Sequence, residues 1–222
     1  MSLTRDTILS GDLARMIREA GEGHRIMSDE DRERSLQAAL AAHTLGEDIW
    51  VFGYGSLIWN PAFHYEERST AVLDGFHRAF CLWTPIGRGS PETPGLTLGL
   101  KPGGRCRGVA FRVAADAVMT ELDVVWRREM VTGAYRPTWV PLQMIDDGLQ
   151  RQALTFVMDP ENERYAGELT SDATAAAIAH ATGRLGTCRE YLFNTVAHLE
   201  ELGLPDEHLR DLVARVNRII GT

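Results

Sequence analysis

The chain has 222 residues, of which 44% are hydrophobic and 24% charged, and its net charge is −8. This length suits one domain with a sizeable core, and no apolar run approaches the roughly 18 residues that a membrane-spanning helix needs. The acidic balance argues against nucleic acid as a partner, and the charged N-terminus argues against a secretory signal peptide. We therefore expect a cytoplasmic protein without a membrane or nucleic-acid partner.

The cysteines and histidines are scattered along the chain. Cys81, Cys106 and Cys188 lie far apart, and no pair among the seven histidines has the spacing of metal ligands. We therefore expect no bound metal. The odd number of cysteines is typical of buried thiols in a reducing compartment, although the sequence also allows one disulfide.

Two helices are expected to open the chain, at about Arg5–Glu19 and Asp29–Ala42. Ser28 has the residue type of an N-cap, and Asp31 stands at the second position of a capping box. We expect residues 1–47 to form a helical extension packed on a main domain of residues 48–222.

From Asp48 onward, short runs of β-branched, aromatic and aliphatic residues predict strands. The expected strands are Ile49–Phe52, Thr70–Leu73, Phe76–Leu82, Leu96–Leu100, Gly108–Val113, Thr138–Ile145 and Gln152–Val157. The "DDG" sequence at Asp146–Gly148 predicts a hairpin between the last two.

One helix is expected among the strands and three after them. Their ranges are Ala115–Arg128, Ser171–Thr182, Thr187–Leu202 and Pro205–Ile220. Thr187 and Glu190 match a capping box at the start of the third. Many short strands flanked by helices predict an α+β fold around a small, mostly antiparallel β-barrel or curled sheet. The connections are too short for repeated βαβ crossovers, which disfavours a doubly wound sheet.

The first candidate for function is "DIWVFGYGSLIWN", Asp48–Asn60, where a buried strand breaks at Gly53-Tyr54-Gly55-Ser56. The two glycines permit positive φ and a close approach of a ligand to the backbone. Successive N–H groups in such a turn form a cradle for a carboxylate or an oxyanion. The stretch matches neither a Walker A loop nor a nucleophile elbow. The alternative is a tight turn whose glycines serve sterics alone.

The second candidate is the acidic side chain of Glu129 in "AVMTELDVVWRREM". At 100° per residue, Glu129 falls on the apolar face between Leu122 and Val118. Residues that widen this face are Met119, Trp126 and Met130, and those outside it are Glu121, Asp123, Arg127 and Arg128. Burial should raise the pKa of Glu129, which suits a general acid/base near neutral pH. The alternative is a carboxylate that faces solvent or pairs with an arginine.

Further candidates lie in a turn, a loop and a helix. Tyr135 in "TGAYRP" offers a hydroxyl and an apolar wall, while Tyr191 lies on the predicted helix that contains "CREYLFNT". The Pro/Gly-rich loop Arg88–Gly95 has the composition of a segment that edges a pocket. Packing is the alternative reading for both tyrosines.

Taken together, these motifs resemble those of the ChaC-type γ-glutamylcyclotransferases, the glutathione-specific branch of the cyclotransferase fold. The resemblance rests, in chain order, on "VFGYGSLIWNPAF", "RGSPETPG", "WRREMVTGAY", "DDG" and "GTCREYLFNT". It extends from about Ile49 to the C-terminal region. The first two predicted helices lie outside it and receive no role from it.

The resemblance implies cleavage of glutathione into 5-oxoproline and cysteinylglycine, with neither a metal nor an organic cofactor. It implies that Glu129 is the acid/base of the reaction. The residues it implies for binding the substrate are Tyr54, Gly55, Ser56, Leu57, Tyr135 and Tyr191. The "REMVTGAY" spacing is longer than the "RE…GGY" of some relatives, a departure that affects the placement of Tyr135 but not that of Glu129.

Three other functions are compatible with the sequence. The first is the same chemistry on other γ-glutamyl amines. The second is a hydrolase with Ser56 as nucleophile, for which His64 and His77 are the available bases. The third is a ligand-binding module without catalysis.

Overall fold

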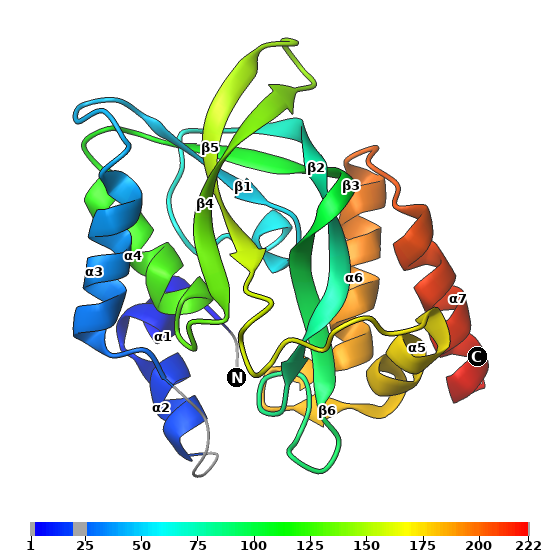
Figure 1. The fold of residues 1–222 in the computed structure, drawn as a ribbon. Helices are drawn as coiled ribbons and strands as arrows, with labels where there is room; N and C mark the ends of the chain where they lie inside the picture. Colours follow the sequence, from blue (N-terminus) through cyan, green and yellow to red (C-terminus); the bar gives the residue numbers. More distant parts are fainter. Residues whose placement is uncertain (1–2, 20–25, 222) are drawn as a thin grey trace.

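The computed structural model of the chain describes residues 3–19 and 26–221. Within these residues a β-barrel lies between two groups of helices (Figure 1), which confirms the predicted α+β fold. Residues 1–2 and 20–25 of the predicted extension lie outside the described residues. Among the described helices, none combines the length and the apolar character that crossing a bilayer requires.

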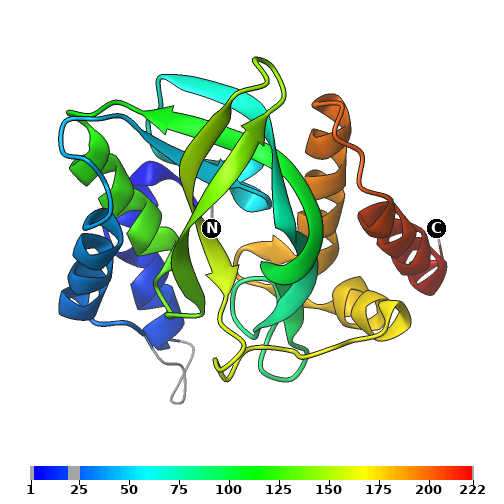
Figure 2. The same ribbon diagram turned by 45° about the horizontal axis from the view of Figure 1, so that its top comes forward.

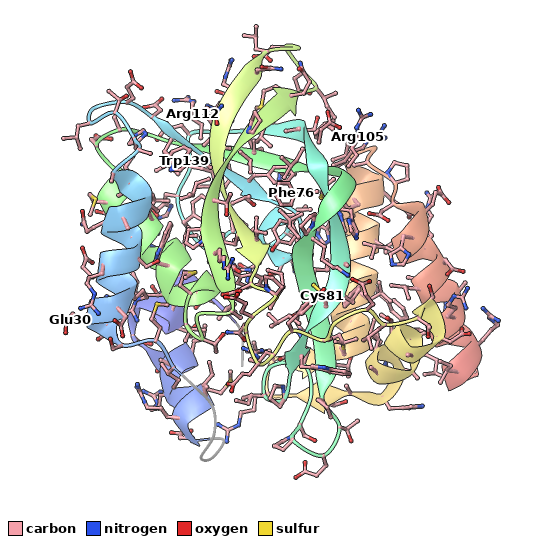
Figure 3. All side chains as sticks on the ribbon, viewed as in Figure 1. Glu30, Phe76, Cys81, Arg105, Arg112 and Trp139 are labelled. Carbon is pink, nitrogen blue, oxygen red and sulfur yellow. The ribbon has the colours of Figure 1, made fainter. Side chains whose placement is uncertain are left out.

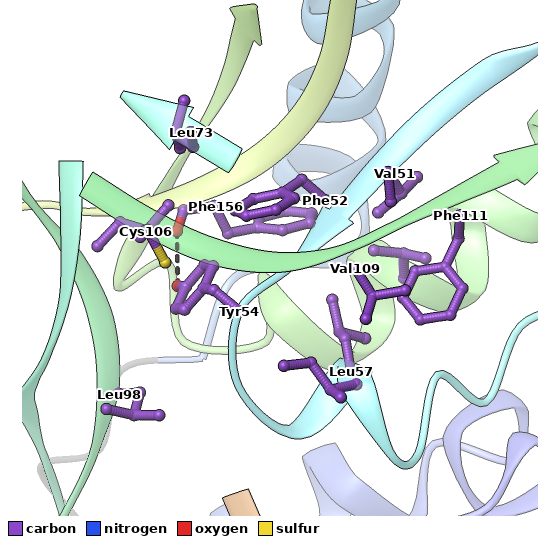
Figure 4. Close-up of a cluster of buried hydrophobic side chains, with 14 of the residues drawn as sticks. Val51, Phe52, Tyr54, Leu57, Leu73, Leu98, Cys106, Val109, Phe111 and Phe156 are labelled. Atoms are coloured by element: carbon purple, nitrogen blue, oxygen red, sulfur yellow. Dashed lines mark hydrogen bonds between the residues drawn. The ribbon is translucent and has the colours of Figure 1, made fainter. Parts of the chain in front are cut away.

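The barrel strands are β1 Ile49–Gly53, β2 Glu67–Thr84, β3 Gly95–Val113, β4 Tyr135–Met144 and β5 Gln150–Met158. They close in the order β1-β3-β2-β4-β5, with antiparallel neighbours except where β5 lies parallel to β1 and β3. The predicted turn at Asp146–Gly148 joins β4 to β5 as a hairpin, as expected. Large apolar side chains such as Phe52, Phe111 and Phe156 fill the core between these strands (Figure 4).

Strands β2 and β3 are longer than predicted. Each unites two of the expected strands, because β2 and β3 pair with each other along most of their length. Gly75, with φ of +85°, lies at a register shift between Asp74 and Phe76, where the sequence predicted a break. The ladder pairs Asp74 with Arg105 on one side of this bulge and Phe76 with Pro102 on the other, and Figure 3 labels Arg105 and Phe76 on the two strands.

Four helices cover one side of the barrel in the described part of the chain (Figure 1). They are α1 Arg5–Leu9, α2 Asp12–Glu19, α3 Asp29–Leu40 and α4 Val118–Glu129. The predicted helix at 5–19 is divided because Gly11 adopts φ of +77°. Ser28 caps α3 as predicted, since its hydroxyl accepts a hydrogen bond from the Asp31 N–H. Trp139 of β4 (Figure 3) donates to the Ala39 carbonyl at 2.8 Å and so ties α3 to the barrel.

The other side of the barrel carries the C-terminal helices, which Figure 2 shows apart from the first group. They are α5 Ser171–His180, α6 Cys188–Glu201 and α7 Glu207–Ile220, with a short ribbon of β6 Thr182–Gly183 and β7 Gly186–Thr187 before α6. The predicted capping box between Thr187 and Glu190 is present. It starts α6 at Cys188 and therefore places Tyr191 in the first turn of the helix.

The burial of α4 differs from the prediction of a single apolar face. Glu121 and Arg128, expected outside that face, are only 4% and 6% exposed, while Met119, expected on it, is exposed. The reason is that α4 packs against α1 and α3 as well as the barrel core. A helix covered on two sides buries polar residues that a single stripe would leave in water.

Candidate active site

The bend after β1 presents backbone N–H groups at the end of a buried strand. A single 3₁₀ turn, η1 Ser56–Ile58, follows Gly55, and its first bond runs from the Ile58 N–H to the Gly55 carbonyl at 2.9 Å. The amides that precede this bond have no acceptor within the turn. An anion cradle formed by these N–H groups stays a prediction.

The two glycines meet a steric requirement, the alternative considered for this turn, and the expectation of positive φ is wrong. Neither Gly53 nor Gly55 has positive φ. Instead, a Cβ at Gly53 would lie 2.9 Å from the Leu57 Cβ, and one at Gly55 would lie 2.9 Å from the Tyr191 hydroxyl oxygen. A side chain at Gly53 would therefore collide with the base of the Leu57 side chain, whereas one at Gly55 would require the hydroxyl end of Tyr191 to move.

A pocket of about 670 Å³ opens beside this bend, and its volume is in the range of small-molecule sites. Its walls come from the bend, the end of α4, strands β2 to β5, α2 and the start of α6. The residues predicted to bind or react with substrate all line it: Tyr54, Gly55, Ser56, Leu57, Glu129, Tyr135 and Tyr191. Segments separated by more than a hundred residues thus meet at one cavity.

Glu129 is the last residue of α4, and its side chain is 17% exposed. Burial raises the pKa of its carboxyl above the ordinary value for glutamate, while Arg128 beside it acts in the opposite direction without cancelling the effect. The expected burial and one of the alternatives occur together. The carboxyl is mostly buried, and it pairs with an arginine at 2.9 Å from Arg128 Nε.

Arg128 connects Glu129 to the bend. Its Nη2 donates to the Ser56 hydroxyl at 2.8 Å, and its Nη1 donates to the Asn60 carbonyl. One guanidinium therefore holds the carboxyl and the end of the bend in a fixed relation. Sequence reasoning missed Arg128 because the helical wheel put it on the solvent side.

The three tyrosines form walls of the pocket. The Tyr54 hydroxyl donates to the Phe156 carbonyl at 2.7 Å (Figure 4), and that of Tyr135 donates to the Leu98 carbonyl at 2.9 Å. Burial, and then the charge of Glu129, raises the pKa of Tyr191 to about 12. Burial likewise raises the pKa of Tyr54 and of Tyr135, to which the charge of Glu129 also contributes. These phenols stay protonated near neutral pH and serve to shape the site.

The predicted loop Arg88–Gly95 contributes Arg88 to the rim of the pocket. The Arg88 guanidinium lies 5.8 Å from the centre of the Tyr191 ring and 3.3 Å from the Thr187 carbonyl. Both contacts join the loop to the first turn of α6.

The surroundings of Ser56 do not form a nucleophile's triad. Its hydroxyl accepts from Arg128, and neither His64 nor His77 is among the residues that line the pocket. The backbone N–H of His64 donates to Glu121, and the His77 ring contacts the Gly103 carbonyl. No base is placed to take a proton from Ser56 among the described histidines.

Two groups of pocket residues carried no signal in the sequence. Arg164 lies in a loop after β5, and the apolar side chains of the extension come from a segment to which no role was assigned. The latter are Leu3, Leu13, Met16 and Ile17. The amphipathic pattern of α2 could have indicated a buried face, but not that the face lines a cavity. Among the described residues, no three metal-binding side chains are grouped as a metal site would require.

Comparison with known proteins identifies relatives of the whole chain. Residues 49–219 match the family described as ChaC-like protein. The glutathione-specific gamma-glutamylcyclotransferase of Escherichia coli (strain K12) is 42% identical over 218 residues, which cover 98% of this chain and 94% of the relative. Glutathione-specific gamma-glutamylcyclotransferase 1 of Homo sapiens is 33% identical and covers 78% of this chain and 80% of its own.

A solved structure shares the fold. The crystal structure of a gamma-glutamyl cyclotransferase specific to glutathione from yeast superimposes with a TM-score of 0.71 at 23% identity. The match covers 78% of this chain and 96% of the yeast chain. The barrel with its flanking helices is therefore the fold of those enzymes.

Proposed function

The chain belongs to the ChaC-like family, and we propose that it is a glutathione-specific γ-glutamylcyclotransferase, a lyase that releases 5-oxoproline and cysteinylglycine. The observation that carries this proposal is Glu129, a mostly buried carboxyl with a raised pKa that lines the pocket and is joined through Arg128 to the Ser56 bend. We further propose that residues 1–47 are an extension packed on a single catalytic domain of residues 48–222.

The reaction is an attack of the substrate on itself. The α-amine nitrogen of the γ-glutamyl group adds to its own γ-carbonyl carbon and closes a five-membered ring. The carbon–nitrogen bond to cysteine then breaks, and the dipeptide leaves as an amine. Because both reacting groups belong to one molecule, the pocket needs only to hold a bent conformer, and no protein nucleophile or cofactor is needed.

Glu129 moves the proton in this proposal. As a carboxylate it accepts a proton from the attacking amine, and as an acid it donates that proton to the leaving nitrogen. A raised pKa suits both steps near neutral pH. The other pocket side chains are poorly suited, since the tyrosines have raised pKa values, the arginines stay protonated and Glu163 is exposed.

The bend holds the γ-glutamyl part. The N–H groups from Gly55 to Leu57 receive a negatively charged oxygen, which is either the α-carboxylate or the oxyanion of the tetrahedral intermediate. The walls formed by Tyr54, Tyr135 and Tyr191 enclose the ring as it forms. We also propose a cytoplasmic location, where glutathione is abundant as a reductant and buried free thiols such as Cys188 persist.

The test is incubation of the purified protein with glutathione and detection of 5-oxoproline and cysteinylglycine by mass spectrometry. Parallel reactions with other γ-glutamyl amines measure the preference for glutathione. Release of glutamate in place of 5-oxoproline would contradict intramolecular cyclisation.

Substitution of Ser56 separates the proposal from a serine hydrolase. Ser56→Ala removes one hydrogen bond with Arg128, worth roughly 1 kcal/mol, so turnover should fall by about tenfold at most. Intact-mass measurement during turnover should detect no acyl-enzyme in the wild type. Complete loss of turnover in Ser56→Ala, with a trapped acyl-enzyme in the wild type, would favour the hydrolase.

A further inference from the structure

The arginines that line the pocket differ in what neutralises them. Arg128 pairs with Glu129, and Arg88 lies 3.8 Å from the carboxylate of Glu190. Arg164 has no carboxylate within ion-pair distance among the described residues, although it lines the same pocket. Among the described residues, one of the three cations therefore has no carboxylate in direct contact with it.

Two uncharged acceptors hold the Arg164 guanidinium in place. Its Nε donates to the Trp83 carbonyl and its Nη1 to the Thr132 hydroxyl, both at 2.8 Å. A guanidinium has five N–H groups, so three of them, including both on Nη2, have no partner among the described residues. The fixed orientation leaves a fork of donors free, which is the arrangement that binds a carboxylate through two hydrogen bonds.

The surroundings of Arg164 make an anion favourable there. Burial lowers the pKa of this guanidinium, which arginine tolerates without losing its proton. A partly buried charge without a counter-ion carries a desolvation cost that a bound anion offsets. Glu163, the neighbouring residue, is exposed, and its charge raises the pKa of Arg164 without cancelling the effect of burial.

Arg164 is within reach of the catalytic end of the pocket. Thr132, which it contacts, follows Glu129 by three residues, and the pKa of Tyr135 responds to the charges of both Glu129 and Arg164. An extended dipeptide spans about 7 Å from its nitrogen to its carboxylate. If Glu129 protonates the leaving nitrogen, the far end of cysteinylglycine arrives in this region.

The extension closes this region of the pocket with apolar side chains. Leu13, Met16 and Ile17 of α2 pack in one cluster with Ile86 and Val131, and Val131 directly precedes the Thr132 that holds Arg164. Exclusion of water by such a wall strengthens a charge-assisted hydrogen bond. The family match begins at residue 49 and does not include this part of the wall.

From these contacts we propose that Arg164 binds the terminal carboxylate of the leaving dipeptide, in a subsite completed by α2. This inference rests on the proposed cleavage of glutathione and names the residue that selects substrates carrying a carboxylate at that end. Arg164 acts on binding and leaves the proton transfer to Glu129.

The experiment compares glutathione with its monoethyl ester on the glycine carboxylate, in wild type and in Arg164→Gln. The ester retains the γ-glutamyl group and loses only the negative charge that Arg164 would bind. Wild type should favour glutathione over the ester by roughly tenfold to a hundredfold in kcat/KM, mainly through KM. Arg164→Gln should lower kcat/KM for glutathione by a similar factor and turn over the two compounds equally.

Arg136→Gln is the matched control, because Arg136 is an exposed arginine on β4 outside the pocket, and it should retain the wild-type preference. Equal turnover of both compounds by the wild type overturns the subsite without the need for a folded variant. Persistence of the preference in Arg164→Gln, or its loss only in Arg88→Gln, overturns the assignment to Arg164. Absence of 5-oxoproline from the reactions of both compounds overturns the proposed function and this inference with it.

Discussion

Helix α4 carries Glu121 in its first turn and Glu129 at its last residue, both mostly shielded from solvent. At the first end, burial raises the pKa of Glu121, but hydrogen bonds from Arg5 and from the His64 N–H outweigh it, and the net shift is downward. At the second end, burial dominates and the pKa of Glu129 is raised. Two glutamates of one helix are thus driven toward opposite protonation states.

The difference arises from the number and direction of hydrogen-bond donors around each carboxyl. Both Glu121 oxygens accept from the Arg5 guanidinium, and one of them also accepts from the His64 N–H. Glu129 has a single guanidinium partner, Arg128, which divides its donors among Glu129, the Ser56 hydroxyl and the carbonyls of Asn60 and Pro61. A saturated carboxylate is structural, whereas one left with open acceptor positions facing a cavity is available for proton transfer.

The largest expected effect is on the reactive end. Glu129→Gln preserves shape but removes the proton acceptor, so turnover of glutathione should fall by at least about a hundredfold. Circular dichroism should show a folded protein. Rates near those of the wild type would exclude Glu129 as the acid/base and would end the contrast between the two glutamates.

Substitution at the other end should affect stability instead. Glu121→Gln leaves the Arg5 guanidinium facing a neutral amide, and the unfolding free energy should fall by about 2 kcal/mol, below the range for fully buried pairs because Arg5 is 23% exposed. Urea denaturation measures this change. Turnover at a temperature where the variant is folded should remain near that of the wild type, and a loss as large as that of Glu129→Gln would contradict a structural role.

A third prediction concerns the contact between Gly55 and Tyr191 in the pocket wall. Gly55→Ala places a methyl group 2.9 Å from the Tyr191 oxygen, and the resulting shift should lower kcat/KM by about tenfold. Tyr191→Phe removes that oxygen, so the double variant should be more active than Gly55→Ala alone. Equal losses in the single and double variants would show that the close approach is not what requires glycine.

The smallest expected effect is on how the free energy of unfolding depends on pH, which should have opposite signs for Glu129 and Glu121. The raised pKa of Glu129 gives a contribution to stability that is complete below the ordinary glutamate value of 4.5 and is lost as pH rises through the raised pKa. The lowered pKa of Glu121 gives a contribution that is present above 4.5 and is lost as pH falls through the lowered pKa.

Relative to wild type, Glu129→Gln should therefore gain stability as pH rises above the ordinary glutamate value of 4.5 and through the raised pKa. Glu121→Gln should lose stability relative to wild type on the acid side, as pH rises from roughly 2 to 5 through the lowered pKa. Thermal unfolding of the three proteins across both ranges measures both slopes. Parallel slopes would show that the two carboxyls share one charge state.

The fold was predictable where local signals agree with the final packing. The Ser28 cap, the box at Thr187 and the hairpin at Asp146–Gly148 depend on neighbouring residues and are present as expected. The union of the short strands into β2 and β3 was not predictable, since pairing with a distant partner carried the ladder past Gly75. Element boundaries elsewhere moved by a few residues for the same reason.

The site residues could be predicted from the sequence because their motifs are short and specific. In the structure they all line one pocket. Arg128 was missed because a helical wheel contains no information about what covers the other side of α4. Arg164 was missed because the proposal for it depends on which carboxylates lie near it in space. A sequence pattern does not contain that information. Their roles in catalysis and binding remain predictions for the experiments above.

The seam between β1 and β5, where the two strands pair in parallel, affects the order in which the barrel and its active site form during folding. Thr155 donates to the Phe52 carbonyl across a separation of 103 residues, and the Tyr54 hydroxyl bond to Phe156 crosses the same seam. Contacts this remote in sequence form late in folding, because a long loop must close first. The β2–β3 and β4–β5 hairpins can assemble earlier from nearby segments. After dilution from urea, recovery of turnover should therefore follow the slowest folding phase. In that phase β1 pairs with β5 and the bend at Gly53–Ser56 reaches its final position.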